Sequence, residues 1–144
     1  MSLQRNLKMI GCFTSNGEVE LAADLATLRE LLERLSDKAL PLSFELYIPA
    51  TAPAPYDDFL EGLTFRAGDG LLNTEIIGKV LFISGSDENI QALSDDLRWL
   101  IEEIESNANL ERHLHVEYFP DHPYLSPSPV SLVIRGTTSR RSSP

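Results

Sequence analysis

The chain has 144 residues, of which 42% are hydrophobic and 24% are charged, and its formal net charge is −10. These values predict a single domain with its own core over residues 1–136. Residues 137–144 are rich in serine and arginine and have no apolar anchor, so they predict a disordered tail. The negative charge disfavours binding to nucleic-acid phosphates, and no apolar run approaches the roughly 20 residues of a membrane helix. The N-terminus lacks the apolar core of a signal peptide, so we expect a cytoplasmic protein that does not enter membranes.

The N-terminal third predicts a strand, a turn and a helix. Residues 7–14 alternate loosely between apolar and polar, as a strand does, and an Asn-Gly turn follows. Residues 18–21 fit either a second short strand or the beginning of a helix. From Leu21 to Leu35 leucines recur at steps of four and three, which places them on one helix face.

The middle of the chain predicts short strands separated by turns. Residues 40–48 alternate as a strand with one buried face, and residues 49–55 contain three prolines that predict an extended loop. Residues 63–67 and 71–77 flank an Asp-Gly turn, which is the pattern of a β-hairpin.

The second half predicts a strand, a long helix and a strand. Residues 80–83 are apolar, and Ser86 fits the N-cap of a helix over residues 87–106. Trp99 lies off the apolar stripe of this helix. Residues 113–119 alternate as a strand, and residues 130–134 predict a last short strand.

The two halves echo each other, because a strand, a turn, a leucine-striped helix and a strand occur at residues 7–48 and again at residues 79–119. Two such units predict an α+β fold with ferredoxin-like βαβ–βαβ order. We expect a two-layer sandwich in which two helices pack on one face of a mainly antiparallel sheet.

The helix over residues 87–106 is strongly acidic, with seven acids and a single base, Arg98. Three acids occupy its last turns, where the helix dipole disfavours negative charge by about 0.3–1 kcal/mol each. A solvated helix face would explain this composition, and so would a surface that attracts a basic partner. The second explanation gives a set of candidate contacts, which are Asp95, Glu102, Glu103 and Glu105.

His113, His115 and Glu117 alternate along the second-half strand, so their side chains share one face. A His-x-His pair on a strand can chelate a metal when a third ligand such as His122 converges on it. Surface histidines explain the spacing better, so we predict no metal and no cofactor and assign this face to partner binding. The chain also lacks nucleophile-elbow and phosphate-binding glycine motifs, so we expect no enzymatic activity.

Four short runs in the second half of the chain carry a resemblance to a known family. They are Val80-Leu81-Phe82-Ile83-Ser84-Gly85-Ser86, His113-Leu114-His115-Val116-Glu117, Leu125-Ser126 and Ser131-Leu132-Val133-Ile134. With these runs, residues 72–135 resemble immunity protein family thirty-two of the bacterial polymorphic-toxin systems. The resemblance implies an α+β protein that neutralises a cognate toxin by binding it.

Three functions therefore remain open. The first is a non-enzymatic immunity protein that binds and neutralises a bacterial toxin, whose surface we expect to be basic. The second is a small-ligand-binding regulatory domain of ferredoxin-like type, and the third is a metal-dependent enzyme. A homodimer is compatible with the first two functions.

Overall fold

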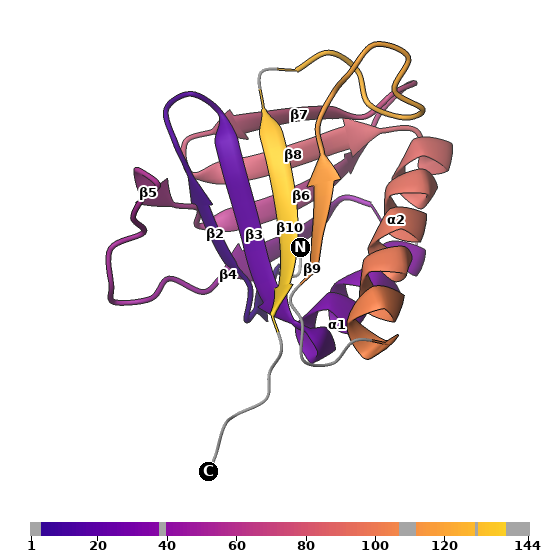
Figure 1. Ribbon diagram of the computed structural model, residues 1–144. Helices are drawn as coiled ribbons and strands as arrows, with labels where there is room; N and C mark the ends of the chain where they lie inside the picture. Colours follow the sequence, from indigo (N-terminus) through magenta and orange to yellow (C-terminus); the bar gives the residue numbers. More distant parts are fainter. Residues whose placement is uncertain (1–3, 38–39, 107–111, 129, 138–144) are drawn as a thin grey trace.

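The computed structural model describes residues 4–37, 40–106, 112–128 and 130–137, and in this part of the chain ten strands and two helices form (Figure 1). The α+β class predicted from the sequence is confirmed. The strands are β1 (Gln4–Leu7), β2 (Ile10–Phe13), β3 (Glu18–Asp24), β4 (Leu42–Leu46), β5 (Asp58–Phe59), β6 (Gly62–Ala67), β7 (Asn73–Ile77), β8 (Val80–Gly85), β9 (Arg112–Val116) and β10 (Ser131–Thr137). The helices are α1 (Leu25–Ser36) and α2 (Asp87–Ser106).

The strands form two mixed sheets of five strands each. The first sheet has the order β1-β4-β6-β8-β7, and the second has the order β5-β2-β3-β10-β9. In the first sheet β1 is parallel to β4 and β6 is parallel to β8, whereas the other neighbours are antiparallel. In the second sheet only β3 and β10 are parallel. The expected single sheet of ferredoxin-like order is therefore replaced by two mixed sheets.

Each helix carries the chain from one sheet to the other. Strand β3 of the second sheet leads through α1 to β4 of the first, and β8 of the first leads through α2 to β9 of the second. The two helices pack against each other along one side of the molecule (Figure 1). In a ferredoxin-like fold both crossovers return to the same sheet. Periodicity shows which face of a strand is buried but not which sheet the strand joins, so the sequence pattern did not separate these topologies.

The element order occurs twice. In β2-β3-α1-β4-β6, with the two-residue strand β5 between β4 and β6 set aside, a hairpin in the second sheet is followed by a helix and an antiparallel pair in the first sheet. In β7-β8-α2-β9-β10 the hairpin lies in the first sheet and the antiparallel pair in the second. The echo predicted from the sequence is thus a repeated ββαββ order, and the parallel pairs β6–β8 and β3–β10 join the two units.

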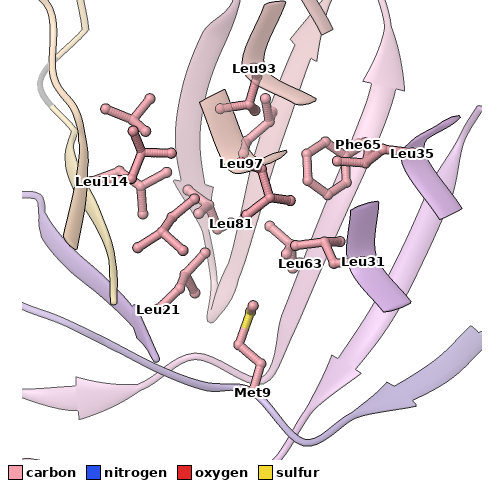
Figure 2. Packing of buried hydrophobic residues seen from close by; sticks show 14 of the residues in the cluster. Met9, Leu21, Leu31, Leu35, Leu63, Phe65, Leu81, Leu93, Leu97 and Leu114 are labelled. Carbon is pink, nitrogen blue, oxygen red and sulfur yellow. The ribbon is translucent and has the colours of Figure 1, made fainter. Parts of the chain in front are cut away.

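Side chains from both helices and both sheets meet in one core (Figure 2). Leu31 of α1 and Leu97 of α2 are at most 2% exposed, as are Leu63 and Leu81 of the first sheet and Leu21 of the second. Burying each such leucine contributes about 1.5–3 kcal/mol relative to leaving it in water. The helices are therefore held by contacts to both sheets, and their outer faces remain in solvent.

Local signals account for both helix starts. Asp24 caps α1, since its Oδ1 accepts a hydrogen bond of 3.0 Å from the Thr27 backbone N–H. Ser86 is the predicted cap of α2, and its Oγ accepts a bond of 3.3 Å from the Asn89 N–H. The prediction that the helix begins at Leu21 is wrong. Leu21 is an inward-facing residue of β3, and the helix begins only at Leu25.

Three further boundaries differ from those expected. The segments at 63–67 and 71–77 do form strands, β6 and β7, but β8 lies between them, so the Asp-Gly turn does not close a hairpin. Strand β9 ends at Val116 and leaves the next three residues in a loop. Thr137 is the last residue of β10, and residues 138–144 of the expected tail lie outside the described residues.

Candidate binding surface on helix α2 and strand β9

The apolar stripe of α2 determines which residues face solvent. Ile90 to Ile104 pack inward at helical spacing, and the buried set is Ile90, Leu93, Ser94, Leu97, Leu100, Ile101 and Ile104. The opposite side of the helix presents Asp95, Trp99 and Glu102, all of which are exposed. The candidate acids of this helix therefore lie on the outside of the molecule, where a partner protein can reach them.

Three of the four candidate acids on α2 have cationic partners within the fold. Asp95 pairs with Arg98 on the same helix, at 3.1 Å between Oδ1 and Nη1. Glu103 lies 3.9 Å from Nε of Arg112 at the start of β9. These exposed pairs contribute at most about 1 kcal/mol each to stability.

Glu105 is the third acid with a partner, since Arg29 of α1 donates to its carboxylate. This pair links the two helices and explains in part why an acid occupies the last turn of α2. Glu102 makes no ion pair with any residue that the structure describes. Its negative charge is therefore not neutralised by any cation of the described residues.

Trp99 lies at the centre of the acidic face. Its side chain is 48% exposed, although tryptophan is among the residues with most to gain from burial. On a helix, residues three and four positions away are neighbours, and for Trp99 all four are acids, namely Asp95, Asp96, Glu102 and Glu103. The sequence had already shown that Trp99 lies off the stripe, and this spacing is the signal that could have added it to the candidate site.

The histidine face of β9 lies on a different surface. Leu114 and Val116 point into the core, so His113 and His115 lie on the outer side of the second sheet, at its edge strand. Their rings stack with centroids 6.3 Å apart. The sequence reasoning placed these histidines together correctly.

Glu117 follows the end of β9, and its Oε2 lies 3.6 Å from Nδ1 of His115. The histidine face and the acidic face of α2 do not form one patch. They adjoin where α2 packs on β9, and the Glu103–Arg112 pair spans that boundary.

An aromatic loop follows β9 and packs beside the acidic helix. Tyr118 and Phe119 are 39% and 53% exposed. Phe119 contacts the ring of His122, which in turn contacts Tyr124 edge to face. Tyr124 is buried, and its hydroxyl donates a hydrogen bond to Asp96 on α2. Burial, and then this bond to a carboxylate, raise the pKa of Tyr124 well above its ordinary value.

His122 holds the loop by accepting backbone hydrogen bonds. Its Nδ1 lies 3.1 Å from the backbone nitrogens of both Tyr124 and Leu125, and both N–H groups donate to it. Burial lowers the pKa of His122, while the charge of Asp96 opposes that shift. Burial and the two accepted hydrogen bonds both favour the neutral imidazole, whose Nδ1 is turned towards the loop backbone.

The described residues provide no group of three histidine, cysteine or acidic side chains placed to hold a metal ion. The third ligand considered from the sequence, His122, uses Nδ1 for the loop backbone. Cys12 lies on β2, and burial together with the negative charge of Glu20 raises the pKa of its thiol. A thiol held protonated in this way is a poor nucleophile at neutral pH.

Residues 80–137 match the family model described as Immunity protein 32. The match is less than half of the chain, and it begins at the first residue of β8 and ends at the last residue of β10. It confirms the resemblance stated from the sequence and includes α2, β9 and the aromatic loop. A search of curated proteins found no match. No helix in the described ranges is long and apolar enough to cross a membrane.

Proposed function

We propose that this chain is an immunity protein that binds a bacterial toxin and neutralises it without chemistry of its own. The family match supports this class of function, because the proteins it describes are immunity proteins. The net charge of −10 gives an electrostatic preference for a basic partner and speeds its approach. We further propose that the protein acts in the cytoplasm, where a toxin that has entered the cell would meet it.

The observation that carries the proposal is the position of the acidic face within the matched stretch. Residues 80–137 include the whole of α2, whose outer side presents Asp95, Glu102, Glu103 and Glu105 around the exposed Trp99. Aromatic side chains are enriched at the centres of protein interfaces, polar residues form their rims, and tryptophan is frequent among the residues that dominate binding. We assign this face as the centre of the contact.

The histidine face extends the proposed contact. His113, His115 and Glu117 adjoin the acidic face across the Glu103–Arg112 pair, so a partner of ordinary interface size, about 800 Å² per side, can touch both. Imidazole side chains form hydrogen bonds through both ring nitrogens, which suits the polar rim of an interface. In this proposal the histidines contribute to specificity and the α2 face contributes most of the affinity.

The test is a binding and rescue experiment with the toxin domain encoded beside the gene for this chain. Purified chain should form a stable complex with that domain, and co-expression should restore growth of cells that produce it. Size-exclusion chromatography of the mixture also gives the stoichiometry and shows whether the chain is a dimer. If the neighbouring genes encode a metabolic pathway and no toxin, the proposal fails.

The alternative of a small-ligand regulatory domain is not carried forward. It depended on a ferredoxin-like βαβ–βαβ order, and the two mixed sheets have a different topology. A groove of about 450 Å³ near Lys8, Ile10 and Tyr47 is open to solvent, and none of the sequence motifs points to it.

A further inference from the structure

Trp99 lies between four carboxylates on the outer surface of α2. Asp95 and Asp96 precede it by four and three residues, and Glu102 and Glu103 follow it by three and four. These spacings place each acid's Cβ about 5–6 Å from that of the tryptophan on the helix surface. We call Trp99 and these four acids the tryptophan frame.

The frame carries more negative than positive charge when its ion pairs among the described residues are compared. Arg98 pairs with Asp95 and Arg112 pairs with Glu103, so two guanidinium groups face four carboxylates. Asp96 accepts from the Tyr124 hydroxyl, which orients its carboxylate but adds no positive charge. Glu102 has no ion pair within the described ranges.

The ring of Trp99 is open to a cation from outside. Elsewhere in the chain Arg66 lies over the Phe82 ring, with its Cζ 4.3 Å from the ring centroid, so a cation already covers that aromatic face. Among the described residues no cation lies over Trp99 in this way. Among the other exposed aromatic side chains, Tyr47 at 57% lines a groove with Lys8 and has no such surround of acids.

We propose that the tryptophan frame binds an arginine side chain of a basic partner protein. A guanidinium group is planar, so it can stack on the indole face while its N–H groups point outwards to carboxylates at the margin. Lysine carries the same charge on a compact, strongly hydrated ammonium. It therefore cannot stack flat on the indole ring while donating hydrogen bonds to the surrounding carboxylates. That the partner is the toxin rests on the function proposed above, whereas the chemistry of the frame does not.

The chain contains one tryptophan, so its fluorescence reports on the frame directly. The probe is a capped peptide of alternating arginine and glycine, compared with its lysine counterpart and with a neutral citrulline counterpart. We expect the arginine peptide to change Trp99 emission saturably, the lysine peptide to bind roughly two- to fivefold more weakly, and the citrulline peptide to leave the emission unchanged. Equal binding of the citrulline peptide, or no saturable change with the arginine peptide, overturns the proposal.

Variants measured with a fluorescently labelled arginine peptide separate the ring from general charge. Trp99→Ala should weaken binding by at least roughly twofold to fivefold, and Trp99→Phe should weaken it less, because phenylalanine keeps a smaller aromatic face. Tyr47→Ala removes an exposed aromatic side chain outside the frame and should leave binding unchanged. If Trp99→Ala binds as tightly as the unmodified chain, the frame is not the arginine site.

The same variants distinguish this inference from the function proposed above. A toxin that binds the unmodified chain and Trp99→Ala with equal affinity contradicts the frame and leaves the immunity function standing. Arginine-dependent binding to the frame without neutralisation of any neighbouring toxin supports the frame and contradicts the immunity function.

Discussion

The hydroxyl of Tyr124 donates a hydrogen bond to the carboxylate of Asp96, and this bond joins the loop after β9 to the middle of α2. Tyr124 also packs its ring against His122, which contacts Phe119. Asp96 is three residues from Trp99 on the helix. The aromatic loop is thereby positioned beside the tryptophan frame, and the two features can meet one partner together.

Removing this hydroxyl should loosen the loop. Tyr124→Phe deletes the donor and leaves Asp96 without its partner, so we expect the free energy of unfolding to fall by about 1–2 kcal/mol, measured by urea denaturation. Asp96→Asn keeps an acceptor for the hydroxyl and should cost less. Equal stability of Tyr124→Phe and the unmodified chain would show that the bond does not hold the loop.

Stability should depend on pH through His122. Burial lowers its pKa in the folded state, so the unfolded chain binds a proton more readily than the folded chain does. The stabilising contribution is therefore complete above the ordinary pKa of about 6.5 and is lost as the pH falls below it. Protonated Nδ1 also can no longer accept the two backbone N–H groups that it holds.

The measurement is the free energy of unfolding of the unmodified chain and of His122→Asn between pH 7.5 and pH 5. Asparagine can accept backbone hydrogen bonds in turns but does not titrate in this range. The difference between the two chains should shrink or change sign as the pH falls. Parallel curves would contradict this role for His122.

Substitutions at two positions of α2, Leu97 and Trp99, should distinguish effects on stability from effects on binding. Leu97 is 1% exposed and lies at the centre of the core (Figure 2), so Leu97→Ala should cost about 2–5 kcal/mol. Trp99 faces solvent two residues later, and Trp99→Ala should change stability by no more than about 1 kcal/mol. Urea midpoints at constant m-value test both. A large loss of stability in Trp99→Ala would mean that the ring serves the fold.

The sequence predicted most reliably the parts of the fold that depend on local periodicity. The bounds of α2 follow from its apolar stripe, and its start follows from the Ser86 cap. Both signals lie within the helix sequence itself and need no distant partner. Leu21 shows where this reasoning fails, because helical spacing continued backwards into β3 by chance. The sheet order depends on contacts between distant segments, such as β6 beside β8 and β3 beside β10, and a strand pattern carries no information about its partner.

In the candidate site, too, local features were predictable from the sequence and contacts between distant segments were not. The composition of α2 was sufficient to identify an acidic helix, and the spacing of its apolar residues was sufficient to place Trp99 away from the core. The partners of its acids were not predictable, because Arg29 and Arg112 reach Glu105 and Glu103 only through the packing of α1 and β9 on α2. Those pairs give part of the acidic charge a partner within the fold. Glu102 is the candidate acid without an ion pair to any described residue, so it is the position at which the proposed contact is best tested.

The most direct test of the proposed function is therefore charge reversal at Glu102 in the complex with the neighbouring toxin domain. Glu102→Lys should weaken the affinity by at least roughly tenfold at low ionic strength and reduce its dependence on salt, because a like charge would then face the basic partner. Glu45→Lys makes the same change in net charge on an exposed position of β4 and should alter the affinity by less than about twofold. If Glu102→Lys and Glu45→Lys bind the toxin with the affinity and salt dependence of the unmodified chain, the acidic face of α2 is not the contact surface.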